Sequence, residues 1–433
     1  MDPTAVGIIG IVVLIVLLFS RMPVGFVMAL VGFVGFSFMV NLKAGLSLLA
    51  KDIFAIFGSY SLTVVPLFIL MGQMAFHAGI SRRLYDTAYT FFGHYPGGLA
   101  MATVGACAGF AAICGSTNAS AATMATVALP EMKRFGYDRK LATGTVAAGG
   151  SLGILIPPSV IFIIYGIMTE QSIGKLFIAG IIPGIILAAF FCITIYMWAK
   201  MRPEVAPRGP KVGWGERIRS LSGVAETLVL FILVMGGLFA GLFTPTEAGA
   251  VGAGGAIVLA LVRRRLSWQG FVQAMLESTR ISCMVLMIVA GATIFGHFLA
   301  ITRIPYTLAN WVAGLPLPHW AIMAVIIGVY LIGGCFLDAL ALILLTIPIF
   351  YPVVTSMGYH PIWFGVIIVL VTQMGVITPP VGVNVYVVSG VAKDVPLEDI
   401  FRGALPFLIA LILASLILIP FPQLALFLPG LMK

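Results

Sequence analysis

Two short stretches carry the residues with the clearest chemical potential, because each sets a Pro-Pro pair inside an apolar segment long enough to cross a bilayer. They are residues 153–159 (GILIPPS) and residues 375–381 (GVITPPV). Proline lacks a backbone donor and clashes with the carbonyl four residues earlier, so two in series must break a helix. In hydrocarbon, broken backbone is tolerated only where it is buried in protein or lines a polar cavity. Each stretch therefore predicts two half-helices joined by extended backbone that could hold a cation or an anionic group.

A run of small and polar residues, 115–120 (GSTNAS), interrupts the apolar stretch 97–130. The run is too polar to face lipid, so we expect a re-entrant helical hairpin with this run at its tip. Hydroxyl, amide and free carbonyl oxygens are ligands that suit Na⁺ at interrupted helices. Such side chains also join membrane helices through hydrogen bonds, but a whole run beside a helix break favours an ion-binding tip over a purely structural one.

An acidic residue takes the corresponding place in the second half of the chain. Asp338 lies in the stretch 333–339 (GGCFLDA). The separation in sequence between Ser116 and Asp338 equals the separation between Pro157 and Pro379, and we call this separation the repeat offset. Ionisable residues inside a membrane usually mark ion paths or proton relays, with helix capping or packing as the alternative. Thr378 and Asn384 flank the second Pro-Pro pair and add oxygen donors. We expect each half to hold one cation between its hairpin tip and its broken helix.

The repeat offset relates the two halves at other positions. It recurs in the pairs Pro23 and Pro245, Pro130 and Pro352, and Gly136-Tyr137 and Gly358-Tyr359. With one residue of slip, Gly180 and Pro183 match Gly403 and Pro406. Chance placement of proline would not give one shared offset. We therefore predict two homologous halves, 1–200 and 221–433, joined by a linker at 201–220, a duplication typical of secondary transporters.

The composition indicates a polytopic membrane protein. Hydrophobic residues make up 61% of the chain and charged residues 9%, which leaves too little polar surface for a soluble fold. The net charge of +9 is therefore interpreted by its placement along the chain rather than as a sign of nucleic-acid binding. The five cysteines lack CxxC spacing and imply neither disulfides nor zinc. We expect the first apolar run, 4–19, to be a retained span rather than a signal peptide.

The apolar segments predict an all-α fold with five crossings and one hairpin in each half. A span needs about 20 apolar residues, and the first half offers spans at 4–20, 24–42, 61–79 and 175–198, an interfacial helix at 43–60, the hairpin at 97–130 and a broken helix at 139–168. The second half offers spans at 221–243, 246–262, 281–300 and 403–425, an amphipathic piece at 266–280, a hairpin at 318–352 and a broken helix at 361–392. Because five is odd, the second repeat enters the membrane inverted relative to the first.

Lys and Arg test this arrangement, because cytoplasmic loops carry the excess of positive charge. The predicted spans place 19 of the 24 Lys and Arg residues, among them Arg21, on one face. The other five are Lys43, Lys51, Lys175, Arg303 and Lys433. We therefore predict a periplasmic N-terminus, a cytoplasmic linker, a first hairpin that opens to the cytoplasm and a second that opens to the periplasm.

Several motifs resemble the large membrane subunit of tripartite ATP-independent periplasmic (TRAP) transporters, a DctM-like protein of the ion-transporter superfamily. They are 66–72 (PLFILMG), 96–99 (PGGL), Gly115-Ser116, 155–159 (LIPPS), 243–248 (FTPTEA) and 377–384 (ITPPVGVN). The resemblance implies an elevator-type Na⁺ symporter, with scaffold and transport domains, that takes up a small organic carboxylate across the bacterial inner membrane. It also implies a small four-helix membrane subunit and a periplasmic substrate-binding protein. Nothing in the stretch 1–20 resembles the small subunit, so we expect it to be a separate chain.

Carried over to this sequence, the resemblance assigns the hairpin tips and Pro-Pro breaks to sodium and substrate. It implies two or more Na⁺ sites built from Gly115, Ser116, Asn118, Gly153, Pro157, Gly334, Asp338, Thr378 and Gly382. It implies a substrate site between them built from Thr117, Ser120, Pro158, Ser159, Pro380 and Asn384. No Lys or Arg lies in these motifs, so a substrate carboxylate would be met by half-helix N-termini, hydroxyls and bound Na⁺. The substrate stays open among sialic acid, C4-dicarboxylates, keto acids and sugar acids.

Three alternatives share part of this pattern. A carboxylate or ion transporter of the same superfamily that acts alone would carry similar motifs and need no periplasmic partner. A membrane transferase or protease is disfavoured, because no HExxH, P-loop or acidic diad occurs and only Asp338 and the end-placed Glu226 and Glu247 lie in the spans. A channel is disfavoured because inverted repeats with broken helices suit alternating access. We expect no organic cofactor.

Overall fold

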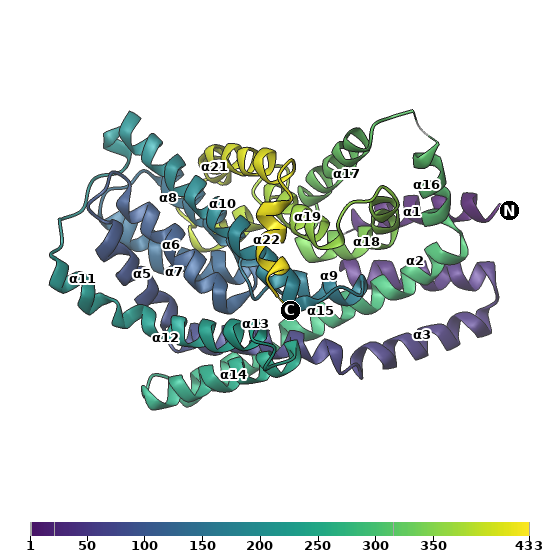
Figure 1. The fold of residues 1–433 in the computed structure, drawn as a ribbon, viewed down its shortest axis with the longest axis horizontal. Coiled ribbons are helices and arrows are strands. Elements are labelled where there is room, and N and C mark those ends of the chain that lie inside the picture. The colour runs from purple at the N-terminus through teal and green to yellow at the C-terminus, as the bar shows by residue number, and fades with distance from the viewer. Residues whose placement is uncertain (1, 21, 315, 433) are drawn as a thin grey trace.

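The structure, a computed structural model, describes residues 2–20, 22–314 and 316–432, so Arg21 and Lys433 of the predicted charge pattern lie outside the described residues. Within those ranges every regular element is a helix (Figure 1). The first half contains α1 (Pro3–Leu18), α2 (Val24–Met39), α3 (Leu42–Phe57), η1 (Ser61–Thr63), α4 (Val64–His77), α5 (Ile80–Phe92), α6 (Gly98–Cys114), α7 (Thr117–Arg134), α8 (Arg139–Ser151), η2 (Leu152–Ile154), α9 (Val160–Met168), α10 (Ile173–Met201) and η3 (Pro203–Val205). The remainder contains α11 (Trp214–Ser220), α12 (Ser222–Phe231), the π-helical turn η4 (Ile232–Gly236), α13 (Gly237–Phe239), α14 (Pro245–Val262), α15 (Trp268–Ile301), α16 (Ile304–Ala313), α17 (His319–Gly334), α18 (Ala339–Ser356), α19 (Pro361–Gly375), α20 (Val383–Val391), α21 (Leu397–Leu418) and α22 (Gln423–Gly430).

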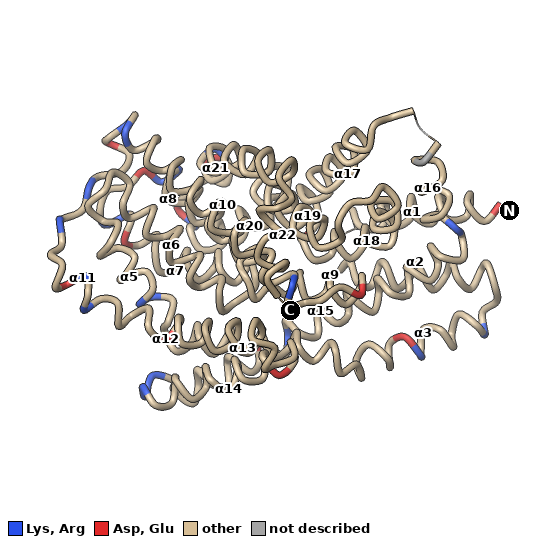
Figure 2. Tube along the Cα trace, viewed as in Figure 1, with Lys and Arg blue, Asp and Glu red and all other residues tan. Residues whose placement is uncertain are grey.

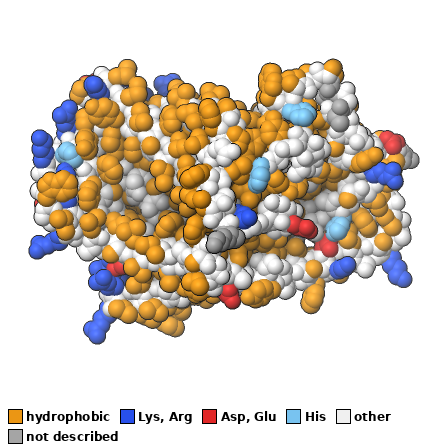
Figure 3. All heavy atoms as spheres, in the orientation of Figure 1, with side chains coloured by type: hydrophobic (Ala, Val, Ile, Leu, Met, Phe, Trp, Pro, Cys, Tyr) orange, Lys and Arg blue, Asp and Glu red, His pale blue; other side chains and the backbone are white. Residues whose placement is uncertain are grey.

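The helices are long and apolar enough for a protein that crosses a membrane several times. In the described part, six helical segments are long and apolar enough to cross a membrane: α10, Ser222–Phe239, α14, α15, α18 and α21. Helix α3 and the segment Ser61–His77 would together also be long and apolar enough, although the chain bends by 54° between them. Figure 3 shows hydrophobic side chains across the visible face, with Lys and Arg mostly at its two ends. The chain is therefore an all-helical, polytopic membrane protein.

The helix bounds in the two halves correspond at the repeat offset. Helices α7 and α18 are related by this offset at both ends, and α8 and α19 at their first residues. Helices α5 and α16 also correspond closely, although no element is predicted at either place. The N-terminus and α11 lie at opposite ends of the long axis (Figure 1), and more Lys and Arg gather at the α11 end (Figure 2).

One prediction about the second half is wrong. The amphipathic piece at 266–280 and the span at 281–300 are one continuous 34-residue helix, α15. In the first half the equivalent segment is broken, because Gly58 ends α3 before α4 begins. The residue related to Gly58 by the repeat offset is Arg280, and arginine has a high helix propensity whereas glycine has a low one. The nearby Ser278 and Ser282 donate hydrogen bonds to carbonyls of their own helix. Nothing therefore interrupts α15.

The predicted span at 403–425 is also misplaced at both ends. Helix α21 begins earlier, at Leu397. Glu398 and Asp399 lie in its first turn, where acidic side chains interact favourably with the positive end of the helix dipole. It ends at Leu418, just before Pro420 and Pro422, which cannot continue a helix. A separate short helix, α22, follows.

Small residues allow several helix pairs to approach closely. A Cβ atom added to Gly144 of α8 would overlap the backbone of Gly403 in α21, and a Cβ on Gly403 would overlap the carbonyl of Lys140. Gly25 of α2 and Gly291 of α15 are in the same kind of contact. In a membrane, where lipid is as apolar as leucine, such close packing is a main source of helix association.

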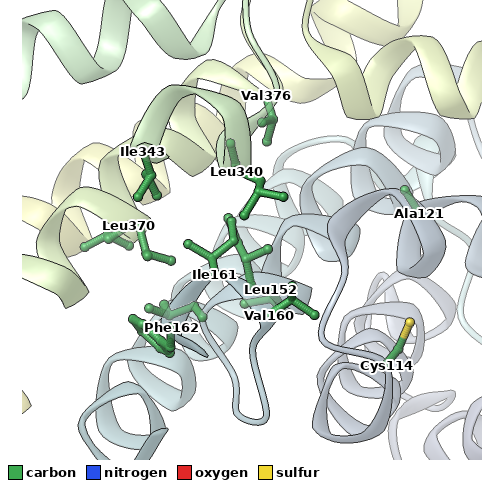
Figure 4. Packing of buried hydrophobic residues seen from close by; sticks show 14 of the residues in the cluster. Cys114, Ala121, Leu152, Val160, Ile161, Phe162, Leu340, Ile343, Leu370 and Val376 are labelled. Atoms are coloured by element: carbon green, nitrogen blue, oxygen red, sulfur yellow. The ribbon is translucent and has the colours of Figure 1, made fainter. Parts of the chain in front are cut away.

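Figure 1 shows how these pairs are arranged. Helices α12, α13, α14, α15 and α3 line one long edge of the molecule, α5 to α8 gather near α11, and α16 to α19 gather toward the opposite end. Helices α9 and α18 meet in an apolar core, where Leu340 of α18 lies beside Ile161 of α9 (Figure 4). The core thus joins the second half's hairpin to the first half's broken helix.

A buried ionic cluster joins the linker-proximal helices. Glu226 of α12 is only 4% exposed, and its two carboxylate oxygens accept hydrogen bonds from Arg83 of α5. Nε of Arg263, at the end of α14, lies 3.2 Å from the same carboxylate. A buried carboxylate needs such partners, because an unpaired charge in this environment is strongly destabilising. The cluster therefore holds three helices together.

A matched pair of substitutions tests the close packing of α8 on α21. We expect Gly144→Ala to destabilise the protein by about 1–3 kcal/mol, because the new methyl group meets backbone that cannot move aside. Gly254→Ala in α14, where nothing lies within 4 Å of the added atom, should leave stability unchanged or slightly raised. Thermal unfolding of both variants in detergent measures the difference. Equal melting temperatures would contradict the packing described here.

Candidate functional site

The two hairpin tips border one small cavity, here called the tip cavity. Its volume is about 70 Å³, room for roughly two water molecules. The polar lining comes from the tips, and the rest of the wall is apolar. It is lined by Ile69, Gly115, Ser116, Thr117, Asn118, Ile154, Val160, Ile161, Ile281, Met284, Val285, Asp338, Ala339 and Leu340. Helices α4 and α15 thus cover the tips from one side.

The first tip is built by a left-handed glycine and a helix cap. Gly115 has φ = 64° and ends α6, and Ser116 then caps α7 by accepting a hydrogen bond from the N–H of Ala119. A glycine is required at 115 for two reasons. The positive φ is strained for other residues, and a Cβ would lie 2.6 Å from the carbonyl oxygen of Pro158 in the helix break.

The first helix break is closed by its own serine and by the tip. The Ser159 hydroxyl donates to the carbonyl of Ile154 (2.6 Å) and accepts from the N–H of Phe162, so it bridges the Pro-Pro break and caps α9. The N–H of Val160 points to the carbonyl of Gly115 at 3.5 Å. The break and the tip therefore satisfy each other's backbone groups away from water.

The second half repeats this plan with different residues. Asp338 caps α18 by accepting from the N–H of Leu340 at 3.1 Å. The N–H of Val381, just after the second Pro-Pro pair, donates to the carbonyl of Cys335 at 3.1 Å. Gly334 and Gly375 allow this approach, because a Cβ on either would crowd the backbone of the other.

Two polar contacts cross between the halves. The Asn118 amide lies 3.5 Å from Oδ1 of Asp338, so the two tips face each other. Deeper in the core, the Ser151 hydroxyl lies 3.3 Å from Oε1 of Gln373, and these two residues are related by the repeat offset. Equivalent positions of the two halves therefore meet at the centre of the molecule.

Several buried polar atoms near the breaks have no hydrogen-bond partner among the described residues. They are Ser120 Oγ, Thr145 Oγ1, Gln373 Nε2 and Asn384 Oδ1. The Asn384 amide nitrogen donates to the carbonyl of Ala147 at 3.0 Å, which leaves only its oxygen free. Buried polar atoms normally have a partner in the protein or an ordered ligand. The three oxygens among them could therefore accept from a bound water or help to ligate a cation.

The structure brings some of the predicted site residues together and separates others. Five of them line the tip cavity: Gly115, Ser116, Thr117, Asn118 and Asp338. Ten lie in or beside the breaks and tips and do not line it: Ser120, Gly153, Pro157, Pro158, Ser159, Gly334, Thr378, Pro380, Gly382 and Asn384. Among these, Gly153 packs under the first tip, since a Cβ there would lie 2.5 Å from the carbonyl oxygen of Ser116.

Several of these ten residues stabilise or shape the backbone at the two helix breaks. The Thr378 hydroxyl donates to the carbonyl of Met374 at 2.5 Å, and Gly382 adopts φ = 58° before α20 begins. The prolines form the cis bonds Pro157-Pro158 and Pro379-Pro380. The apolar lid of the cavity, formed by Ile69, Ile281, Met284 and Val285, carries no sequence signal, because aliphatic residues are everywhere in these helices.

The polar groups that line the tip cavity could ligate a hard cation through oxygen atoms. Its polar lining offers hydroxyl, amide, carboxylate and backbone carbonyl groups, and no lining residue is Lys or Arg. In the described part of the chain, no three His, Cys, Asp or Glu residues cluster as a transition-metal site would require. Ionisable side chains inside a membrane protein usually have polar partners, and those of Asp338 are the Asn118 amide and the N–H of Leu340.

The whole chain matches a known transporter family. The family model described as "Tripartite ATP-independent periplasmic transporter, DctM component" covers residues 11–424. A C4-dicarboxylate TRAP transporter large permease protein of Pseudomonas aeruginosa is 39% identical, over 88% of this chain and 89% of that protein. An isethionate TRAP transporter permease protein DctMQ of Oleidesulfovibrio alaskensis is 37% identical over 88% of this chain, which spans 60% of that longer protein.

A solved structure shares the fold at low sequence identity. The YdaH transporter of Alcanivorax borkumensis superposes with a TM-score of 0.65 over 88% of this chain and 89% of its own, at 14% identity. At that identity the likeness concerns the arrangement of helices alone.

Proximity of the two tips can be tested directly by crosslinking. In a variant without the five native cysteines, we expect Asn118→Cys and Asp338→Cys together to be joined by a short bifunctional thiol reagent, because the native side chains lie 3.5 Å apart. The control pairs Asn118→Cys with Ser356→Cys, at the far end of α18 and about 27 Å along that helix from its cap. Proteolysis followed by mass spectrometry detects the joined peptides. Equal yields from both pairs would refute the geometry.

Proposed function

The chain belongs to the DctM family of tripartite ATP-independent periplasmic transporters, and from this membership we propose that it drives Na⁺-coupled uptake of a small organic carboxylate across the bacterial inner membrane. It is a transporter rather than an enzyme. The observation that carries the proposal is the tip cavity, where two capped helix starts, a carboxylate and an amide converge without any lysine or arginine. Such a site needs a bound cation before it can accept an anion.

Electrostatics at Asp338 favours coupling to a cation. An anionic substrate near Asp338 would meet a like charge, and removing either from water unpaired is costly. A cation bound first at Asp338, Ser116 or the tip carbonyls would neutralise the carboxylate and attract the substrate. Binding of Na⁺ and substrate is then mutually favourable, which is the thermodynamic condition for symport. We propose two or more Na⁺ sites, one at each tip and break.

The substrate class rests on the site and on relatives. Helices α7 and α18 both begin at the tip cavity, and N-terminal helix ends favour carboxylate groups. The names of the relatives cover a C4-dicarboxylate and isethionate, so family membership does not select one solute. We propose a small carboxylate, with a C4-dicarboxylate as the first to test because the 39% identical relative carries that name.

The mechanism that we propose is an elevator built on an inverted repeat. The tip cavity, at about 70 Å³, is smaller than an organic acid with its ions, so the wall formed by α4 and α15 must separate from the tips during transport. The hairpins and broken helices share backbone hydrogen bonds within each half and meet across the halves. They would therefore move as one body against α4 and α15, which belong to the frame.

We propose the same topology as the charge pattern predicts. The N-terminus lies at the end of the molecule with fewer Lys and Arg, and α11 lies at the other end. The positive-inside rule then makes the N-terminus periplasmic and the linker cytoplasmic. The proposed partners are a small four-helix membrane subunit on a separate chain and a periplasmic substrate-binding protein. They fit the word tripartite in the family description and the greater length of the DctMQ relative.

Reconstitution tests the whole proposal. Uptake of a labelled C4-dicarboxylate into proteoliposomes should require an inward Na⁺ gradient together with the small subunit and the binding protein. Uptake that proceeds equally in K⁺ would contradict sodium coupling. Uptake by the large subunit alone would favour a transporter that works without partners.

Two substitutions separate charge from helix capping at the second tip. Asp338→Asn keeps an oxygen that can cap α18 but removes the negative charge, and Asp338→Ala removes both. We expect Asp338→Asn to raise the Na⁺ concentration for half-maximal uptake about tenfold or more, because a charged ligand is lost. Ser116→Ala should cause a smaller rise. Normal sodium dependence in Asp338→Asn, with loss of folded protein only in Asp338→Ala, would show that the residue is just a cap.

Relative motion of the tips and the frame can be tested by a second crosslink. Leu340 of α18 and Val285 of α15 both line the tip cavity, whereas Ser120 does not. We expect a crosslink between Leu340→Cys and Val285→Cys to stop uptake while Na⁺ binding persists. A control crosslink between Lys133→Cys and Asp394→Cys, whose native side chains pair at 2.6 Å within the moving body, should leave uptake intact. Full uptake by a completely crosslinked Leu340 and Val285 pair would exclude the elevator.

A further inference from the structure

A second cavity shares no lining residue with the tip cavity, and Lys133, Arg139 and Asp394 are among the residues that line it. We call it the basal cavity. Its volume is about 500 Å³, and it is a partly open cavity bordered by α7, α8, the end of α20 and the segment that follows it. Its wall is largely apolar, and charged groups lie at its mouth. It is lined by Ala125, Thr126, Leu129, Pro130, Lys133, Tyr137, Arg139, Ala142, Thr143, Val391, Ala392, Asp394 and Val395.

The repeat shows that the fold does not require this space. At the repeat offset, Leu129 and Ala142 of the basal cavity correspond to Tyr351 and Phe364, which are much larger. Phe364 is fully buried, and the Tyr351 hydroxyl donates to the carbonyl of Thr169 and accepts from Gln171. The equivalent place in the second half is thus filled by aromatic side chains. The first half has the smaller residues Leu129 and Ala142 there, and a cavity lies beside them.

The mouth of the basal cavity carries a net positive charge. Lys133 pairs with Asp394 at 2.6 Å, and both side chains are largely exposed. This ammonium group lowers the pKa of Asp394, so the acid stays ionised. Arg139 makes none of the ion pairs found among the described residues, and its guanidinium is exposed. Both cations therefore remain available to an anionic ligand, since Lys133 can donate further hydrogen bonds.

The other charges nearby are already engaged. Lys140 pairs with Asp399 at 3.2 Å, and Arg134 lies 3.9 Å from Glu131 and over the ring of Phe135. These groups do not line the cavity. Arg139 and Lys133 are therefore the cations that a ligand in the basal cavity would meet.

We propose that the basal cavity binds an anionic phospholipid. Its phosphate would lie on Arg139 and Lys133, and an acyl chain would lie against Leu129, Val391 and Val395. Two features together favour a lipid over a soluble anion: the wall behind the cations is largely aliphatic, and Lys133 and Arg139 at its edge are exposed. Basic pockets between membrane helices have this combination. The proposal does not depend on which solute is transported.

Native mass spectrometry of the delipidated protein tests this proposal with two lipids of equal chain length. We expect wild type to retain phosphatidylglycerol more than phosphatidylcholine. Arg139→Gln should lower retention of phosphatidylglycerol about fivefold, the effect of one charge near the headgroup. Asp394→Asn should raise it, because Lys133 loses its competing partner. Arg134→Gln, on the same helix as Lys133 but outside the cavity, is the control and should change nothing.

Two further measurements separate a lipid from other anions. Val391→Trp fills the cavity without changing its charge, and it should reduce retention of phosphatidylglycerol if an acyl chain lies there. Glycerol phosphate in excess should fail to displace the lipid. Equal retention by wild type and Arg139→Gln would overturn the proposal. Displacement by glycerol phosphate, or unchanged retention in Val391→Trp, would assign the site to a soluble phosphate instead. Size-exclusion profiles verify that each variant is folded.

Discussion

Unpaired backbone at the centre of a membrane protein is the constraint on which the rest of this structure depends. Each Pro-Pro pair frees carbonyl and N–H groups where no bulk water can reach them, and each such group costs free energy if left alone. The structure satisfies them from the adjacent hairpin: Val160 reaches the carbonyl of Gly115, and Val381 reaches the carbonyl of Cys335. Neither a break nor a tip can therefore be kept without the other. The glycines at 115, 153, 334 and 375 follow from this need, since each lies where the two backbones touch.

The same constraint explains why the site is rich in oxygen and poor in fixed positive charge. Once backbone groups are exposed inside the protein, helix ends and carbonyls already supply partial charges of both signs. Asp338 adds a carboxyl group to this arrangement and caps α18. A lysine or arginine at the tips would occupy that carboxylate permanently. If a cation binds and leaves with the substrate, as proposed above, the site returns to its starting state after each transport cycle.

The sequence predicted the site's components better than their arrangement. Pro-Pro pairs, the polar run at 115–120 and the repeat offset indicate breaks and tips, because these residue types have strong backbone preferences. Which side chains face the cavity could not be predicted: Ser116 and Asp338 line it, whereas Ser120 and Asn384 are buried in the core. The prediction divided α15 in two because its first part is amphipathic and its second part is apolar. Arg280 does not interrupt a helix, whereas Gly58, its counterpart in the first half, ends one. Contacts across the halves, such as Asn118 with Asp338, depend on packing that no local pattern encodes.

The ionic cluster around Glu226 makes the two halves mechanically unequal. Arg83, Glu226 and Arg263 fasten α5 to α12 and α14. At the repeat offset, the corresponding positions are Pro305, Thr4 and Asn41, none of which is charged. Among the described residues, helix α16, the counterpart of α5, makes no buried ion pair of this kind. If the hairpins move against the frame, as proposed above, the ion pairs of Glu226 would resist that motion at α5, and the corresponding positions beside α16 offer no charged group to do the same.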